Sequence, residues 1–365
     1  MKYYIIAGEA SGDLHGANLM KELMRRDPQA EIRFWGGDAM LKVGGRMMRH
    51  IRDLSYMGIV EVAMHLRTVV GNLKFCKEDI MNFRPNAIIY IDYPGFNLKI
   101  AHWAKKKGFK NYHYISPQLW AWKKGRIKNM RKDLDKLFYI LPFEQNFYAN
   151  NNFPQAYYVG HPLLDAIKAG QWDGKLKIES DKPIIALLPG SRRQELKKML
   201  KPMLTLANNH KEYTFVIAGM KLLGKNFYEP YLSDNVKVVY DQTYGLLSQS
   251  YAAVVCSGTA TLETALFNVP QVVCYKASPI TIAVGRIFIG SRIKYISLVN
   301  LIADQPIVKE LLQNDCNDQN IETEFKNITT DEEKRTYIKE GYAIVHNILG
   351  NAGASAKVAQ LIIEK

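Results

Sequence analysis

The chain has 365 residues, of which 47% are hydrophobic and 23% charged, and its formal net charge is +14. This balance is typical of a folded globular protein, and no segment reaches the roughly 20 apolar residues that a membrane span needs. The length favours two domains over one core, and the surplus of basic residues favours an anionic partner: nucleic acid, a phosphorylated substrate or an acidic membrane surface.

Short apolar runs alternate with helical segments along the chain, which predicts βαβ units around parallel sheets. The predicted strands of the first half are 3–7, 32–35, 87–91, 112–115 and 136–140. The pattern loosens around 165–182 into a linker, and the later predicted strands are 183–188, 214–218, 236–239, 252–256 and 271–275. We therefore expect an α/β protein with two Rossmann-like, doubly wound domains that face a cleft, 1–168 and 180–345, with ligands at the carboxyl ends of the strands.

The N-terminal segment and the cysteines indicate a cytoplasmic protein. The first apolar run is too short for a secretion signal and is soon followed by Glu9 and Asp13. The cysteines show no C-x-x-C spacing, and those within apolar strands are typical of reduced core thiols. They are Cys76, Cys256, Cys274 and Cys316. The sequence also lacks metal-ligand spacing, so we expect neither a metal nor another cofactor.

The first predicted strand ends in a turn with glycines at positions 8, 12 and 16. This spacing differs from G-x-G-x-x-G, so a dinucleotide cofactor is not indicated. Glu9, Ser11, Gly12, Asp13 and His15 are candidates for contacts with an acceptor or the cleft. The alternative is simply a well-capped first helix.

Asp92 follows an apolar predicted strand and opens a turn that closes at Asn97. An unpaired carboxylate at such a strand end is costly unless it caps, pairs or takes part in catalysis. Asp92 could be a general base that removes the proton of an acceptor hydroxyl, with Asn97 nearby in the same site. The alternative is a turn-forming Asp before Tyr-Pro-Gly.

Aromatic and basic residues alternate in the segment 116–132, which begins S-P-Q-L-W-A-W-K. Such a segment could stack bases and bind phosphates, as in proteins that bind single-stranded nucleic acid. It could equally border an acyl-phosphate site, where Gln118 is a candidate contact. In the third interpretation the tryptophans are core residues and the charges lie on a solvated helix. His161, before the linker, is expected to be structural.

The second half contains two turns suited to a diphosphate. L-L-P-G-S-R at 187–192 places Gly190, Ser191 and Arg192 directly after a strand, and Arg192 has the forked, permanent charge that binds phosphate; the alternative for it is a surface salt bridge. V-V-C-S-G-T-A-T-L-E at 254–263 is a strand followed at once by a helix, whose first N–H groups form an anion site. That site comprises Ser257, Gly258, Thr259 and Ala260.

Glu263 follows this anion site by one turn. We expect Thr259 to cap the helix, so Glu263 is not needed for capping. Its carboxylate could accept hydrogen bonds from a ribose diol. An ordinary surface glutamate is the alternative.

Two segments, 57–75 and 279–298, combine apolar side chains with arginine or lysine. In the first, Ile59, Val62, Leu66, Val69 and Leu73 form one helical stripe, and further apolar residues widen it. This composition suits the surface of an anionic bilayer, and a buried helix is the alternative for each segment.

Together these residues resemble the lipid-A-disaccharide synthase family, which are inverting glycosyltransferases of the two-domain GT-B architecture. The similar motifs span nearly the whole chain in the family's order. They are A-G-E-A-S-G-D at 7–13, M-G-I-V-E-V at 57–62, the strand end at 92, S-P-x-x-W-A-W at 116–122, L-P-F-E at 141–144, L-L-P-G-S-R at 187–192, S-G-T-A-T-L-E at 257–263 and V-K-E-L-L-Q at 308–313.

The resemblance implies a reaction and places residues in it. UDP-2,3-diacylglucosamine would be joined to 2,3-diacylglucosamine 1-phosphate (lipid X) by a β-1,6 linkage, with release of UDP and no metal. Asp92 would be the base, Arg192 and the 258–260 backbone would hold the diphosphate, Glu263 would lie near the ribose, and Asn300 would belong to the same pocket. The family also implies peripheral attachment to the inner face of the cytoplasmic membrane and a last helix, within 346–365, that returns to the N-terminal domain.

Two positions depart from the family pattern. Gly95 replaces a second acidic residue, so another group must orient Asp92, and Val299 replaces a proline before Asn300. The rival functions are a UDP-sugar 2-epimerase and a nucleic-acid-binding module built on 120–132. The second would leave the turns at 190 and 257 unexplained, so we expect no nucleic-acid partner; a homodimer is left open.

Overall fold

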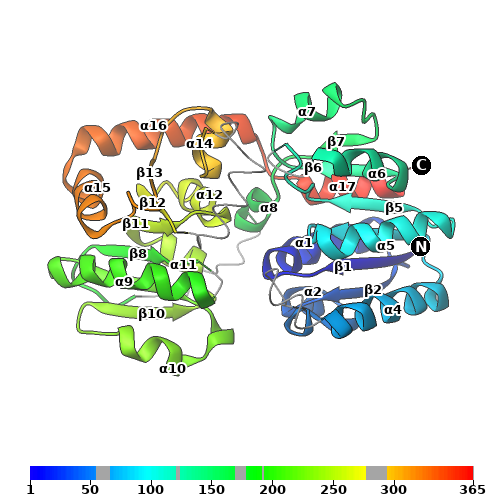
Figure 1. The fold of residues 1–365 in the computed structure, drawn as a ribbon, viewed down its shortest axis with the longest axis horizontal. Coiled ribbons are helices and arrows are strands. Elements are labelled where there is room, and N and C mark those ends of the chain that lie inside the picture. The colour runs from blue at the N-terminus through cyan, green and yellow to red at the C-terminus, as the bar shows by residue number, and fades with distance from the viewer. Residues whose placement is uncertain (55–65, 121–123, 169–177, 191–192, 277–293, 365) are drawn as a thin grey trace. The chain divides into compact units, whose positions relative to one another are not determined.

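The computed structural model describes residues 1–54, 66–120, 124–168, 178–190, 193–276 and 294–364. The chain divides into two compact units, Met1–Ala169 with Asn351–Lys365, and Gly170–Gly350. We call them the first and the second unit. Each contains one parallel sheet between helices (Figure 1). The expected architecture of two doubly wound α/β domains is therefore confirmed.

The first unit contains a seven-stranded sheet in the order β3-β2-β1-β4-β5-β6-β7. Its strands are β1 (Lys2–Ala7), β2 (Glu31–Gly36), β3 (Arg46–His50), β4 (Ala87–Ile91), β5 (Asn111–Tyr114), β6 (Lys136–Tyr139) and β7 (Ala156–Tyr158). Its α-helices are α1 (Ala10–Arg26), α2 (Asp38–Val43), α4 (Leu66–Phe83), α5 (Pro94–Lys106), α6 (Ile127–Asp133), α7 (Glu144–Asn150), α8 (Pro162–Lys168) and α17 (Ala354–Ile363). Short 3₁₀ turns occupy Ile51–Asp53 and Lys124–Arg126.

The second unit contains a six-stranded sheet in the order β10-β9-β8-β11-β12-β13. Its strands are β8 (Ile184–Leu188), β9 (Thr214–Gly219), β10 (Val236–Tyr240), β11 (Ser250–Cys256), β12 (Gln271–Tyr275) and β13 (Lys309–Leu312). Its α-helices are α9 (Arg193–Asn209), α10 (Lys225–Tyr228), α11 (Thr243–Leu247), α12 (Thr259–Leu266), α14 (Leu298–Ala303), α15 (Asp318–Thr330) and α16 (Glu332–Leu349). Lys221–Leu223 and Glu229–Tyr231 are 3₁₀ turns.

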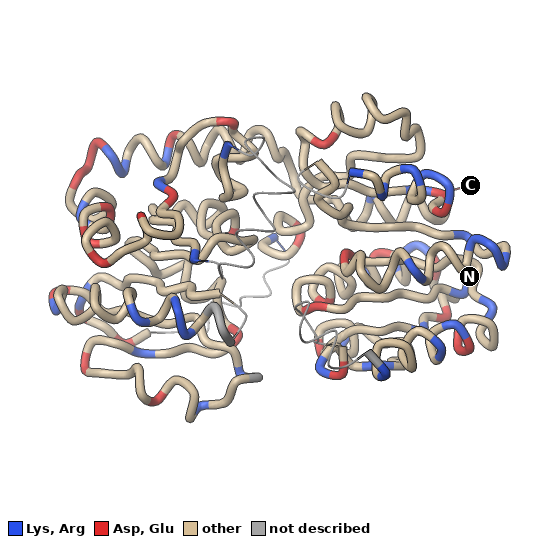
Figure 2. Tube along the Cα trace, in the orientation of Figure 1, with Lys and Arg blue, Asp and Glu red and all other residues tan. Residues whose placement is uncertain are grey.

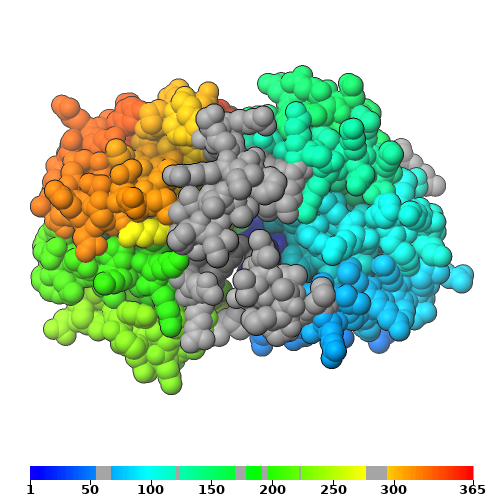
Figure 3. All heavy atoms as spheres, viewed as in Figure 1, coloured from blue at the N-terminus to red at the C-terminus, as the bar shows by residue number. Residues whose placement is uncertain are grey.

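The central strands are buried on both faces, as expected for parallel sheets covered by helices. β4 and β8 consist entirely of buried residues. In the space-filling view the second unit appears mainly in green to orange and the first unit mainly in blue to cyan (Figure 3). Lysine and arginine are interspersed with acidic residues along both units (Figure 2).

The last helix, α17, packs against α1 in the first unit. Val358, Ala359 and Ile362 join the core that contains Tyr3 and Ile89. The helix before it, α16, continues to Leu349, so the expected boundary before residue 346 lies inside a helix of the second unit.

Candidate functional site

The predicted turns lie where the strand order of each sheet reverses. In the first unit β1 pairs with β4, with Ala7 opposite Ile91, so the turns that begin at Gly8 and Asp92 are neighbours. In the second unit β8 pairs with β11, with Leu188 opposite Val255, so the turns that begin at Gly190 and Ser257 are neighbours as well. Ligands of open α/β sheets bind at such reversals, outside the carboxyl ends of the strands.

The two turns of the first unit touch through Gly8 and Tyr93. A Cβ atom added to Gly8 would lie 2.4 Å from the Tyr93 ring, so only glycine fits beneath that ring. Tyr93 has a left-handed backbone with φ 47° and stacks on Phe96, with ring centroids 5.7 Å apart. This contact fixes the path of the chain directly after Asp92.

Asp92 lies between the end of β4 and α5, in a left-handed conformation with φ 45°. Its backbone N–H donates to the carbonyl of Tyr114 at 3.0 Å, which ties the turn to β5. Burial raises the pKa of Asp92 to about 6, against a smaller opposing effect of a hydrogen bond from the Tyr93 backbone. A carboxylate with this pKa is ionised at neutral pH and basic enough to act as a general base.

Asn97 holds this turn from within the protein. The side chain is 0% exposed, and Nδ2 donates to the Asp92 carbonyl at 2.7 Å, with longer contacts to Ile6 and Ile91. Oδ1 is buried and has no hydrogen-bond partner among the described residues. Asn97 therefore positions Asp92. It is one of the groups that orient Asp92 in place of the second acidic residue that Gly95 replaces.

The remaining N-terminal candidates divide into surface and interior residues. Glu9 precedes α1, and Ser11 is partly exposed in its first turn. Gly12 is buried, with a Cβ position 3.3 Å from that of Ala7. Asp13, by contrast, accepts hydrogen bonds from backbone N–H groups at 37, 39 and 40, so it caps α2.

His15 is an interior residue of the first unit. It is 5% exposed, and burial lowers its pKa to about 4, so it is neutral at pH 7. Its buried Nδ1 has no hydrogen-bond partner among the described residues. His161, expected to be structural, is also buried, and its pKa is lowered to about 3 by burial and then by His15.

Gln118 is exposed in the loop that follows β5, at the same edge of the sheet as Asp92. The neighbouring Trp120 packs edge-on against Phe143, with centroids 5.0 Å apart. In α6, Ile127 and Met130 enter the core while the basic positions 128, 131 and 132 are exposed. This arrangement matches a helix with one solvated face.

In the second unit, Gly190 has φ 102°, a conformation that favours glycine. It follows β8 and Pro189. Ser191 and Arg192, the predicted diphosphate contacts, lie outside the described residues.

The turn after β11 differs from the expectation in one respect. Gly258 is the N-cap of α12 and Thr259 its first residue, so Thr259 does not cap the helix. Gly258 and Thr259 are exposed and Ala260 is partly exposed, at the positive end of the helix. Ser257 donates from Oγ to the carbonyl of Ile296 at 3.2 Å.

Glu263 lies in the second turn of α12 and accepts a hydrogen bond from the Tyr244 hydroxyl at 3.1 Å. Burial raises the pKa of Glu263 to about 6, with a smaller opposing effect of that hydrogen bond. This partner leaves carboxylate acceptor capacity for a diol. The alternative interpretation, an ordinary surface glutamate, does not fit a side chain that is hydrogen-bonded and partly buried.

Asn300 is 1% exposed and bonds within its own unit. Nδ2 donates to Val308 and Glu310, both at 2.9 Å, and Oδ1 accepts from the Val308 N–H at 3.0 Å. The side chain therefore fixes the segment between α14 and β13, and its described contacts are structural ones.

The two apolar and basic segments are described only in part. Residues 55–65 and 277–293 lie outside the described residues. In α4, Val70 is 57% exposed, whereas Leu73 packs against the core, so that predicted stripe is partly a core face. Among the described helices, none combines the length and the apolar character needed to cross a membrane.

The sequence interpretation missed three residues at these edges: Tyr93, Tyr244 and Glu144. Tyr93 and Tyr244 carried no signal besides their place beside a strand end. Glu144, part of the L-P-F-E motif, is completely buried.

Sequence comparisons point to one family. A family model described as lipid-A-disaccharide synthetase matches residues 3–361. The chain is 36% identical to lipid-A-disaccharide synthase of Syntrophus aciditrophicus (strain SB), over 98% of this chain and 96% of that protein. It is 35% identical to lipid-A-disaccharide synthase of Coxiella burnetii (strain CbuG_Q212), over 98% of this chain and 96% of that one.

Solved structures show the same fold at low sequence identity. UDP-GlcNAc 2-epimerase from Neisseria meningitidis, bound to UDP-GlcNAc, matches with a TM-score of 0.70 and 14% identity, covering 100% of both chains. The glycotransferase of kitacinnamycin matches with a TM-score of 0.66 and 13% identity, covering 99% of this chain and 98% of that one. At such identities these likenesses bear on the fold alone.

Proposed function

The chain belongs to the lipid-A-disaccharide synthase family, and from that premise we propose its substrates and mechanism. A glycosyltransferase of lipid A disaccharide synthesis needs an activated sugar donor and a sugar acceptor. We propose that UDP-2,3-diacylglucosamine is the donor and lipid X the acceptor. The acceptor 6-hydroxyl oxygen attacks the anomeric carbon opposite UDP, the bond from that carbon to UDP breaks, and a β-1,6 linkage forms with inversion.

The observation that carries this proposal is the placement of Asp92 at the strand reversal of the first sheet. Its carboxylate receives the acceptor proton as the new bond forms, and its pKa of about 6 suits that role near neutral pH. Tyr93 and Asn97 hold the turn that follows Asp92. Glu9, Ser11, Gly12 and Gln118 are our candidate acceptor contacts.

We assign the donor to the reversal of the second sheet. Gly190 and the 257–260 turn provide close backbone approach and a helix N-terminus for the diphosphate, with Ser191 and Arg192 as further contacts. Glu263 binds the ribose diol beside Tyr244. Together these groups stabilise the negative charge that develops on departing UDP, so a metal is not required by this proposal.

We also propose that the protein works at the inner face of the cytoplasmic membrane. Both proposed substrates carry acyl chains and phosphate, which suits a surface that is apolar and basic. Val70 is exposed on α4, and Arg67 and Lys74 on the same helix are exposed as well. This composition favours an anionic bilayer.

The test is a transfer assay with radiolabelled UDP-2,3-diacylglucosamine and lipid X in detergent micelles containing a chelator. We expect disaccharide and UDP in equal amounts. If folded protein that binds UDP gives no product but interconverts UDP-sugar epimers, the epimerase takes the place of this proposal. Salt-sensitive oligonucleotide binding without turnover would favour the nucleic-acid-binding module.

A further inference from the structure

A buried carboxyl lies two strands away from Asp92, at the same edge of the first sheet. Glu144 is the first residue of α7, after β6, and its side chain is 0% exposed. Oε2 accepts a hydrogen bond from the Leu141 N–H at 3.1 Å, whereas Oε1 is buried without a partner among the described residues. Burial raises the pKa of Glu144 to about 8, against smaller opposing effects of hydrogen bonds from the Leu141 and Ile140 backbone, so the carboxyl is mainly protonated at neutral pH.

The titratable neighbours of Glu144 are tyrosines. Tyr148 lies four residues after Glu144 on α7, so the two side chains share one face of that helix. The pKa values of Tyr148 and of Tyr139 of β6 are raised by burial and then by Glu144. Tyr158 of β7 faces Tyr139, with ring centroids 5.7 Å apart. We call these three residues the tyrosine cluster. None of its members offers a positive charge, so ionised Glu144 would be unfavourable there.

The tyrosine cluster holds the loop that follows β5. The Tyr148 hydroxyl shares a short hydrogen bond with Ser116 Oγ, and that serine donates to the Pro117 carbonyl at 3.1 Å. Leu119, whose N–H donates to the same carbonyl at 2.6 Å, is 1% exposed and lies in one core with Tyr139 and Tyr148. The loop is therefore anchored from the interior while Gln118 stays exposed.

This loop is joined directly to the turn of Asp92. β5 lies between β4 and β6, and the Tyr114 carbonyl accepts the Asp92 N–H. Ile115, the next residue, is left-handed with φ 64°, and its N–H donates to the Phe138 carbonyl at 3.1 Å. Strained residues on two neighbouring strand ends keep their conformations only if their surroundings hold them.

We propose that uncharged Glu144 is a positioning residue, which through Tyr148 and Ser116 holds the loop 115–120 against the turn of Asp92. Ionisation of Glu144 loosens this loop and weakens binding of the sugar beside Asp92. Only the last step, sugar binding, rests on the proposed function.

The first test is hydrogen exchange of the full-length protein, measured on the peptide covering 115–120. Wild-type protein and Glu144→Gln are compared at pH 7 and pH 9, with rates corrected for the intrinsic pH dependence of exchange. Glutamine keeps an uncharged side chain of the same shape. We expect the corrected rate of the wild type to rise about tenfold at pH 9, where the carboxylate predominates, and that of Glu144→Gln to stay constant.

The second test uses transferase activity and a matched pair of hydroxyl deletions. Tyr148→Phe removes the bond to Ser116, whereas Tyr158→Phe removes a buried hydroxyl with no hydrogen-bond partner among the described residues. We expect Tyr148→Phe to raise the KM for lipid X several-fold more than Tyr158→Phe. In Glu144→Gln we expect the alkaline decline of kcat/KM above pH 8 to disappear.

An equal rise in exchange for wild type and Glu144→Gln would overturn the proposal, and so would an unchanged alkaline decline in Glu144→Gln. Loss of activity in Glu144→Gln with unchanged exchange would show that the carboxylate itself is needed. If exchange behaves as expected but no protein transfers sugar, the proposed function fails while the control of the loop by Glu144 stands.

Discussion

Left-handed residues other than glycine gather at the carboxyl edge of the first sheet. Asp92, Tyr93 and Ile115 have φ values of 45°, 47° and 64°. Each such conformation costs of order 1–2 kcal/mol, so the fold must supply compensating contacts. At Asp92 these contacts are the Asn97 amide and the Tyr114 carbonyl. Strain maintained in this way indicates that the position of the side chain matters more than local stability.

Replacing Asp92 with asparagine keeps the shape of this side chain and removes its basicity. We expect turnover to fall about 100- to 10,000-fold, the range that general base catalysis supplies, with UDP affinity preserved. The base works in its ionised form, so kcat/KM of the wild type should fall about tenfold per pH unit below pH 6. Steady-state kinetics and titration calorimetry with UDP measure both effects. Wild-type rates in Asp92→Asn would remove Asp92 from the mechanism.

Gly95 lies in the first turn of α5, where it is exposed and a Cβ atom would meet nothing within 4 Å. Gly95→Ala should therefore stabilise the first unit by about 0.5–1 kcal/mol, because alanine loses less backbone entropy. Gly8→Ala is the matched contrast, since its Cβ would strike Tyr93, and we expect it to destabilise by about 1–3 kcal/mol. Urea denaturation gives both values. Destabilisation by Gly95→Ala would contradict the open space at that position.

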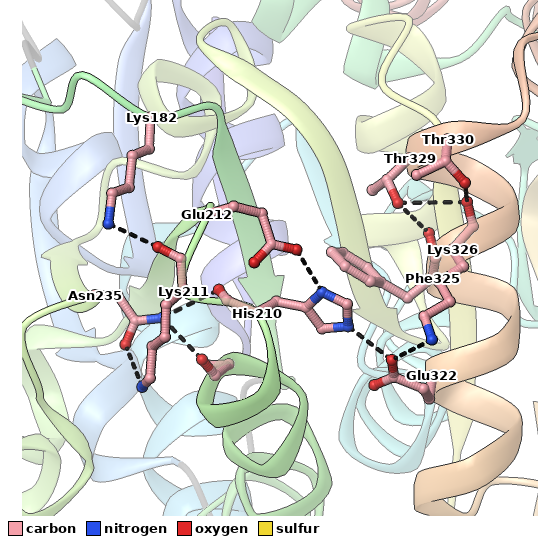
Figure 4. Close-up of polar contacts among 11 residues, drawn as sticks. Lys182, His210, Lys211, Glu212, Asn235, Glu322, Phe325, Lys326, Thr329 and Thr330 are labelled. Atoms are coloured by element: carbon pink, nitrogen blue, oxygen red, sulfur yellow. Dashed lines mark hydrogen bonds and ion pairs between the residues drawn. The ribbon is translucent and has the colours of Figure 1, made fainter.

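At the scale of elements, a histidine hydrogen-bonded to two carboxylates lies at the amino-terminal edge of the second sheet (Figure 4). His210 follows α9, and its ring nitrogens lie 2.7 Å from carboxylate oxygens of Glu212 and Glu322. Lys326 of α15 pairs with Glu322 at 3.2 Å. These contacts join the turn before β9 to α15, away from the carboxyl ends of the strands, so we assign them to stability.

Glu322→Gln tests this tie through its pH dependence. Burial raises the pKa of Glu322, but hydrogen bonds from His210 and Lys326 outweigh burial, and its pKa is lowered. A lowered pKa in the folded state stabilises above the pKa of the unfolded chain, and this stability is lost as pH falls. Because Glu322 is partly exposed, we expect a loss of about 1 kcal/mol at pH 7 that diminishes as pH falls below the ordinary pKa of a glutamate. Glu333→Gln, at an exposed position, is the control, and thermal unfolding measures the stability of both variants. A stability difference between Glu322→Gln and the wild type that stays constant across pH would contradict this role of Glu322.

At the scale of the molecule, the chain passes from the first unit to the second after Ala169 and returns after Gly350. One side chain of the first unit links the helix before the first passage to the helix after the second. Asp165 of α8 accepts backbone N–H groups of Gly353, Ala354 and Ser355 at 2.5, 3.2 and 2.7 Å. It thereby fixes the start of α17 next to the end of α8. The first unit is thus completed by the two ends of its sequence.

Asp165→Ala should destabilise the first unit by about 1–3 kcal/mol, because three N–H groups at the start of α17 lose their acceptor. Calorimetry of the full chain should show a lower unfolding temperature for that unit, with the second unit unchanged. Exposed Asp181→Ala in the second unit is the control. If Asp165→Ala unfolds like the wild type, α17 does not depend on this cap.

The sequence alone predicted the central strands and the turns after them. The apolar runs 87–91 and 271–275 predicted buried parallel strands, and these bounds agree with those of β4 and β12. The edge strands β3, β7 and β13 were not predicted, because R-M-M-R-H, A-Y-Y and K-E-L-L lack a continuous apolar run. Edge strands are paired on one side only, so their composition carries a weaker signal.

Which turns meet, and which side chains are buried, was decided only by the tertiary structure. Nothing within residues 8–13 or 92–97 specifies that β1 pairs with β4; the order of strands results from packing among distant segments. For the same reason Asp13, His15 and Asn300 are interior residues although they stand in turns or helices that the sequence marks as polar. Local sequence determines strands and turns through the periodicity of side chains, whereas burial and protonation depend on neighbours that the chain brings together only when it folds.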